Sequence, residues 1–203
     1  MSTKLKSREE QIDNKSNNSK IIRGNRRLIR EKVLQILVAY FTSNIDINLL
    51  VEHIFCRIFC IDENDIVYEN TDNDTRLLNE VELMNIDLDV TIQWKEEEIE
   101  YGKDIIFSTI KNYDSYVDYI ENASLNWGFS RITIIDRTII MIAITEFIFA
   151  PDVPIKVSIN EALELAKNYS TDKSPVFVNG ILEKIKHMLE DKKIINKSER
   201  GTR

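Results

Sequence analysis

The sequence has few of the residues that make turns and covalent cross-links. Its 203 residues include only five glycines, three prolines and two cysteines. So few turn-forming residues argue against an all-β fold, and they leave no glycine-rich loop that could hold a phosphate. The chain shows no secretory signal segment, so the two cysteines, Cys56 and Cys60, are interpreted as small buried residues on one helix face rather than as a disulfide.

Motifs for catalysis and metal binding are missing as well. The sequence contains no GxSxG, Walker, HExxH or CxxC pattern. Glu161 and Glu164 are three residues apart on an expected helix, but nothing nearby supplies a second catalytic group. We therefore predict a protein that is not an enzyme, with no cofactor and no metal site.

The most apolar segment, residues 132–150, is interrupted by charge. It contains Asp136, Arg137 and Glu146, which would make a membrane span costly. The segment is better explained as a central buried helix, and the chain as a cytoplasmic protein that does not enter a membrane. The core positions expected on this helix are Ile139, Ile142, Ala143 and Phe147.

Apolar residues recur at helical spacing through most of the chain, which predicts an all-α fold of about seven helices in two packed small bundles. The bundles are expected at about 23–90 and 95–190, between a disordered arm at 1–22 and a flexible tail at 191–203. The expected helices cover about 26–41, 46–60, 75–90, 95–123 (with a possible break near Gly102), 131–149, 159–170 and 175–190.

Two helix starts are marked by local patterns. Ser158 and Glu161 have the spacing of a capping box, in which each side chain satisfies a backbone donor of the first turn. Ser174 precedes Pro175, and proline is favoured at the first helical position because its missing N–H costs nothing there. These patterns predict helices that begin just after Ser158 and Ser174.

Charge is strongly segregated along the chain. Residues 20–32 contain six basic residues and one acidic residue, whereas residues 62–104 contain 15 acidic and three basic residues; the net charge is −7. Arginines at a helix N-terminus oppose the helix dipole, so Arg26, Arg27 and Arg30 are mildly unfavourable for stability. This asymmetry indicates a nucleic-acid-binding surface within an acidic protein.

Two blocks of the sequence resemble the NusB family of transcription antitermination proteins. The first, residues 25–37 (NRRLIREKVLQIL), is similar to the arginine-rich start of these proteins. The second runs from about 127 to 185 and includes VSINEALELAKNY and SPVFVNGILEKI. Two positions depart from the family pattern: Met141 replaces a common arginine, and Lys173 stands where relatives often have an acid.

The resemblance implies an RNA-binding factor that binds boxA-like single-stranded RNA together with the ribosomal protein NusE. Such a factor acts in the antitermination complex of RNA polymerase and supports read-through in ribosomal RNA transcription. By position in the motifs, the implied partner-binding residues are Gln35 and Asp136. The implied RNA-binding residues are Arg26, Arg27, Arg30, Lys173, Ser174 and Phe177. The basic Lys173 further predicts RNA binding that depends less on the partner than in relatives.

Two other interpretations stay open. One is a non-catalytic helical RNA-binding module like the N-terminal domain of ribosomal-RNA cytosine methyltransferases. The other is a helical adaptor that binds only protein, which a salt-dependent RNA gel shift would distinguish. Phe177 also has a structural alternative, since its ring could pack against the preceding helix. The sequence leaves the choice between monomer and homodimer undecided.

Overall fold

The computed structural model describes residues 22–56, 92–124 and 128–195. The expected N-terminal arm up to residue 21, the expected helix at 75–90, Cys60 and the end of the expected tail lie outside these ranges. Contact clustering divides the chain into two compact units. One contains residues 1–24 and 60–94, and the other contains residues 25–59 and 95–203.

The described part of the smaller unit is a pair of very short strands. Strand β1 (Ile22–Arg23) pairs in parallel with β2 (Ile92–Gln93), and the Gly24 N–H donates to the Gln93 carbonyl at 2.8 Å. The sequence predicts no strand here, because two residues are too few to show an alternating pattern.

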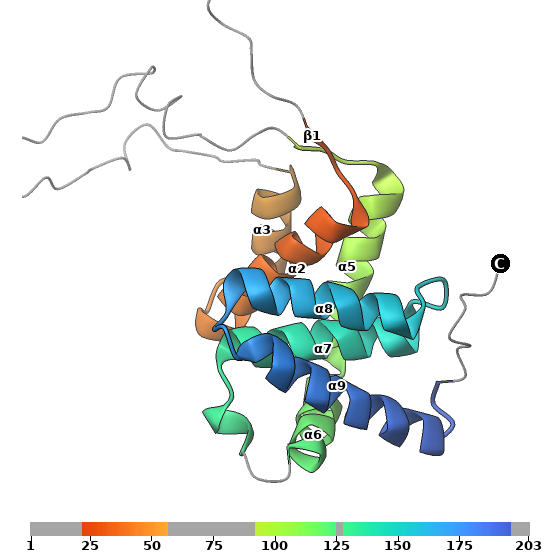
Figure 1. Cartoon of the computed structure of the whole chain (residues 1–203). Helices are drawn as coiled ribbons and strands as arrows, with labels where there is room; N and C mark the ends of the chain where they lie inside the picture. The colour runs from red at the N-terminus through yellow and green to blue at the C-terminus, as the bar shows by residue number, and fades with distance from the viewer. Residues whose placement is uncertain (1–21, 57–91, 125–127, 196–203) are drawn as a thin grey trace, which may run out of the picture. The chain divides into compact units, whose positions relative to one another are not determined.

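The described residues of the larger unit confirm the all-α class predicted from the sequence (Figure 1). A short π-helix, η1 (Glu52–Cys56), follows α3, and a 3₁₀ turn, η2 (Phe129–Arg131), precedes α7. The α-helices are α2 (Arg26–Thr42), α3 (Ile47–Val51), α5 (Glu96–Lys111), α6 (Tyr113–Ala123), α7 (Ile134–Phe149), α8 (Ile155–Tyr169) and α9 (Ser174–Asp191).

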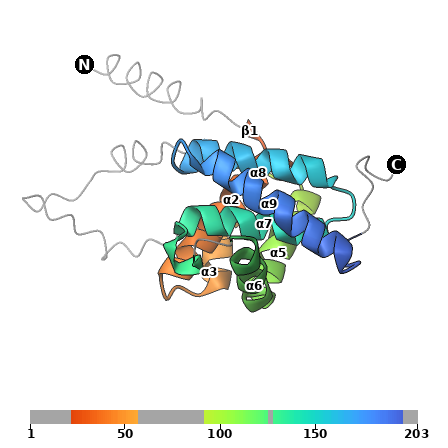
Figure 2. The same cartoon turned by 60° about the horizontal axis from the view of Figure 1, so that its bottom comes forward.

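Helix α7 is the centre of this unit. It packs against α2, α5, α6, α8 and α9, and both views show α8 and α9 alongside it (Figures 1 and 2). A helix that is apolar on all sides must be covered on all sides, which is what the 132–150 segment predicted. No helix within the described ranges is long and apolar enough to cross a membrane. The four predicted core residues are confirmed as buried: Ile139, Ile142, Ala143 and Phe147.

The break expected near Gly102 is wrong. Gly102 lies inside α5, and the chain breaks instead at Asn112, whose side-chain amide donates to the Ser108 carbonyl at 2.8 Å. A Cβ at position 102 would lie 2.8 Å from the Phe55 ring and 3.1 Å from a methyl of Ile29. The glycine is therefore needed for the close approach of α5 to its neighbours, not for a helix end.

The capping box predicted at Ser158 is also wrong. Helix α8 begins one turn earlier, after Pro154, whose carbonyl accepts from the Ser158 N–H at 3.2 Å. Ile155 is buried on the same face as Ile159, so packing extends the helix back beyond the local capping pattern. Ser158 is consequently a buried residue within the helix, and Glu161 is directed to another helix.

Phe147→Ala should lower the free energy of unfolding by about 3–5 kcal/mol, because the ring is fully buried and its removal leaves a cavity. The matched control is Phe149→Ala on the same helix, where the residue is 51 % exposed and the loss should stay below about 1 kcal/mol. Denaturant unfolding followed by circular dichroism measures both. Equal losses in the two variants would show that α7 is not the core.

Candidate functional site

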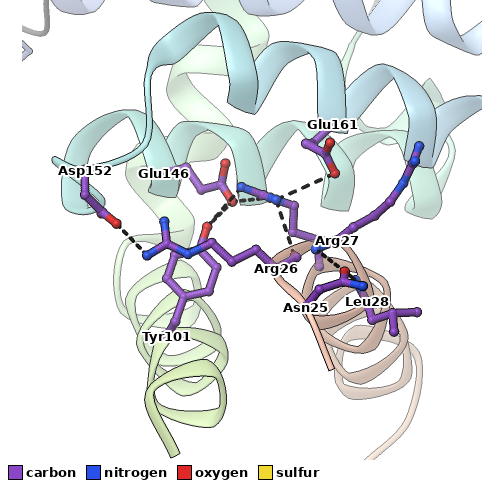
Figure 3. Close-up of polar contacts among 9 residues, drawn as sticks. Asn25, Arg26, Arg27, Leu28, Tyr101, Glu146, Asp152 and Glu161 are labelled. Atoms are coloured by element: carbon purple, nitrogen blue, oxygen red, sulfur yellow. Dashed lines mark hydrogen bonds and ion pairs between the residues drawn. The ribbon is translucent and has the colours of Figure 1, made fainter. Parts of the chain in front are cut away.

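Helix α2 carries the three arginines predicted from the sequence, two of them at the surface of the helical unit. The Asn25 side chain caps the helix by accepting from the backbone N–H groups of Arg27 and Leu28, both at 3.0 Å (Figure 3). An asparagine at this position fixes where the helix begins. It thereby fixes which way Arg26, Arg27 and Arg30 project.

Arg30 is buried in a network of ion pairs and hydrogen bonds with Glu146, Tyr101 and Glu161. Its Nε donates to Glu146 Oε1 at 2.6 Å, and one terminal nitrogen donates to the Tyr101 hydroxyl at 3.2 Å. The other terminal nitrogen lies 3.6 Å from Glu161 and donates to the Arg26 carbonyl at 3.3 Å. The Tyr101 hydroxyl in turn donates to Glu146 at 2.6 Å.

The groups in this network stabilise one another's protonation states. Burial, the largest single effect, lowers the pKa of Arg30, but the charge of Glu146, its hydrogen bond to Arg30, and the smaller effects of Tyr101 and Glu161 together leave the pKa of Arg30 raised. Burial, followed by the negative charge of Glu146, raises the pKa of the Tyr101 hydroxyl. Arg30 therefore stays charged and Tyr101 stays protonated across the physiological range.

The prediction that Arg30 contacts RNA does not fit this geometry. Arg30 is only 4 % exposed and its donors are directed at groups of the protein itself, so a phosphate cannot approach its guanidinium. Its role is to neutralise Glu146 in the interior. The sequence held a signal for this role, because an acid in the middle of the most apolar helix requires a buried partner.

Arg26 and Arg27 remain accessible. Their side chains are 49 % and 50 % exposed, and each forms an ion pair with a carboxylate, Arg26 with Asp152 at 2.5 Å and Arg27 with Glu164 at 2.8 Å. The Arg26 guanidinium also lies over the Tyr101 ring, 4.7 Å from its centroid. RNA contact by these two arginines stays a prediction. Partner contact by Gln35 also stays a prediction. Gln35 is exposed on α2 and accepts a hydrogen bond from Lys32 at 3.2 Å.

A second group of predicted residues gathers where the starts of α7 and α9 meet. They line a hollow of about 290 Å³, which we call the α7–α9 depression. It includes four residues singled out from the sequence, and its full lining is Arg131, Ile132, Thr133, Asp136, Thr171, Lys173, Ser174 and Phe177. Residues far apart in the sequence thus form one surface.

Polar contacts fix the floor of the α7–α9 depression. Ser174 Oγ donates to Asp136 Oδ2 at 3.0 Å and lies 2.9 Å from the hydroxyls of Ser170 and Thr171. Thr133 caps α7 by accepting from the Asp136 N–H at 3.1 Å. Ser174 is buried and begins α9, so its hydroxyl joins the two helices instead of capping its own.

The rim of the depression carries a cation and an aromatic ring. Lys173 is exposed and Phe177 is half-buried, one turn apart at the start of α9. The sequence analysis missed Arg131, Thr133 and Thr171, which have no distinctive spacing and join the site only through folding. Within the described ranges, no group of three His, Cys, Asp or Glu side chains could hold a metal ion.

Solved structures share this helical fold. The structure of NusB from T. maritima aligns with 81 % of this chain and 92 % of its own, with a TM-score of 0.58 and 26 % sequence identity. A crystal structure of the antitermination factors NusB and NusE in complex with double-stranded RNA aligns with 80 % of this chain and 96 % of its own. Its TM-score is 0.57 at 16 % identity, which shows the fold alone.

The sequence comparisons identify the family. The NusB family model matches residues 58–187, and the chain belongs to the NusB family. A transcription antitermination protein NusB from Chloroherpeton thalassium is 47 % identical over 104 residues, which is 49 % of each chain. The NusB protein of Natranaerobius thermophilus is 40 % identical over 105 residues, half of this chain and 76 % of its own. The chain thus spans about half the length of the first relative.

Arg30→Met should destabilise the protein by about 3–5 kcal/mol, because it leaves the Glu146 carboxylate buried beside an apolar side chain. Changing both residues to Met should cost less than the single change, since no uncompensated charge remains. Arg27→Met is the control, and loss of its exposed ion pair should cost below about 1 kcal/mol. Chemical denaturation measures all three. A double variant less stable than Arg30→Met would contradict the buried-charge explanation.

Proposed function

We propose that this protein is an RNA-binding transcription antitermination factor that binds boxA-like single-stranded RNA together with a NusE-type ribosomal protein. Family membership supports the role, and NusB proteins so named are antitermination proteins. The solved complex of NusB and NusE with RNA supports the choice of partners. The role implies cytoplasmic localisation, within the antitermination complex of RNA polymerase, and no catalysis.

The observation that carries the proposal is the α7–α9 depression. It places a cation, Lys173, and an aromatic ring, Phe177, at the first turn of α9, over a polar floor made by Ser174 and Asp136. Single-stranded RNA is recognised by cations that contact phosphates and by aromatic rings that stack on unpaired bases. The N-terminus of α9 adds backbone N–H groups and a partial positive charge, which favour an anion.

Arg26 and Arg27 supply a second set of phosphate contacts in this proposal. Both guanidinium groups are half exposed, and arginine matches the geometry of a phosphate through paired N–H groups. Asp136 and Gln35 are proposed to contact the ribosomal protein. Gln35 is exposed on α2, and Asp136 lines the α7–α9 depression, where its Oδ2 accepts from Ser174.

The central experiment is a titration of the protein with a boxA-like single-stranded RNA, with and without the NusE-type ribosomal protein, at several salt concentrations. We expect binding that weakens as salt rises and tightens when the ribosomal protein is present. A scrambled RNA of equal length is the control for sequence preference. No RNA binding at low salt, with binding of the ribosomal protein retained, would favour the protein-only adaptor.

Lys173→Asp should weaken RNA binding by the protein alone and leave the melting temperature nearly unchanged, because the side chain is exposed. The slope of log Kd against log salt should fall by roughly one unit if one phosphate contact is lost. The matched control is Lys103→Asp, an exposed lysine on α5 that makes the same change in charge away from the depression. Equal effects of the two variants would show that the depression does not bind RNA.

Phe177→Ala tests the aromatic ring. If the ring stacks on a base, the variant should bind RNA about 5- to 100-fold more weakly, as the loss of one stacked base predicts, with little change in melting temperature. If the ring mainly packs, the melting temperature should fall and affinity should follow the fraction folded. Phe177→Tyr keeps a stacking surface and is expected to bind nearly as the parent does, which separates the two roles.

A further inference from the structure

Each accessible arginine at the start of α2 is already paired with a carboxylate from a later part of the chain. Asp152 follows α7 and pairs with Arg26, and Glu164 on α8 pairs with Arg27. The carboxylate side chains are 57 % and 46 % exposed, so both ion pairs are open to water. RNA would therefore meet arginines that each already donate from one terminal nitrogen to a carboxylate.

These two ion pairs are poorly suited to a purely structural role. Ion pairs exposed to water contribute little to stability. Helix α2 is already held by packing against α5 and α7 and by the buried pair between Arg30 and Glu146. The carboxylate oxygens lie 2.5 and 2.8 Å from the guanidinium nitrogens, where phosphate oxygens would have to bind.

We propose that Asp152 and Glu164 are internal counter-ions that compete with RNA phosphate for Arg26 and Arg27. The inference rests on the proposed RNA-binding function. A phosphate displaces a carboxylate from each arginine, so the two acids lower affinity for any polyanion. Only a ligand with further contacts, such as those in the α7–α9 depression, overcomes this competition well. The acids thus act as specificity-determining residues.

The surroundings of Arg26 favour an exchange of partners without movement of the arginine. Its guanidinium stacks on the Tyr101 ring, 4.7 Å from the centroid, and the Tyr101 hydroxyl is fixed by Glu146 at 2.6 Å. When Asp152 leaves, this ring still holds the guanidinium in place. Asp152 is on an exposed turn between α7 and α8.

The test compares two kinds of carboxylate-to-amide variant. One kind removes the carboxylate that pairs with an arginine, and the other changes an acid that pairs with no arginine. Asp152→Asn and Glu164→Gln should each bind a single-stranded RNA oligonucleotide about 2- to 5-fold more tightly at low salt, the range expected for losing one exposed ion pair. The gain should shrink as salt rises, because salt already weakens the internal pairs. The melting temperature should stay close to that of the parent.

Two variants with the same change in charge serve as controls. The first control is Asp104→Asn, because Asp104 on α5 lines the same hollow as Asp152. The second control is Glu121→Gln, because Glu121 is exposed on α6. Among the described residues neither acid forms an ion pair with an arginine. Both controls should bind RNA nearly as the parent does. A double change supplies a third control, since Asp152→Asn should have no effect when Arg26 is already Ala.

The outcomes separate this inference from the proposed function. Parent protein that binds RNA, with Asp152→Asn and Glu164→Gln indistinguishable from their controls, overturns the competition and leaves the function standing. Weaker binding and a lower melting temperature in these variants would also overturn it, because the acids would then position the arginines. Parent protein that fails to bind RNA at any salt overturns the proposed function and this inference with it.

Discussion

The buried pair between Arg30 and Glu146 is the interaction on which the arrangement of this protein depends. Glu146 lies in the most buried helix, and a carboxylate there is tolerated only with a cation beside it. Arg30 supplies that cation from α2, and Tyr101 adds a hydroxyl from α5. One charged contact therefore sets how three helices meet, and it fixes the face of α2 that carries Arg26 and Arg27.

The three arginines at the start of α2 have different roles because their ion pairs differ in burial. Three arginines close together would repel one another, but each has its own carboxylate. The innermost pair is closed to solvent and the outer two are open. The same residue type thus has an architectural role at position 30 and a surface role at positions 26 and 27, and burial alone distinguishes them.

The sequence predicted what depends on periodicity and missed what depends on contacts between distant segments. The burial of α7 followed from one apolar run, and the ends of α2 and α9 followed from local patterns within a residue or two. The Ser158 capping box failed because the packing of Ile155 overrode a local preference. A helix break was expected at Gly102 because the residue that requires a glycine there, Phe55, is distant in sequence. The Phe55 ring lies only 2.8 Å from where a Cβ at position 102 would be. The same limit applies to the site, where family motifs brought out Lys173 and Phe177 but nothing marked Arg131.

The central position of α7 has a consequence for how the protein loses its structure. Five other helices pack against this one element, so each of them loses part of its apolar cover if α7 leaves. We therefore expect the backbone amides of α7 to be among the last in this unit to exchange with solvent. We accordingly expect the helical order of this unit to be lost cooperatively rather than one helix at a time.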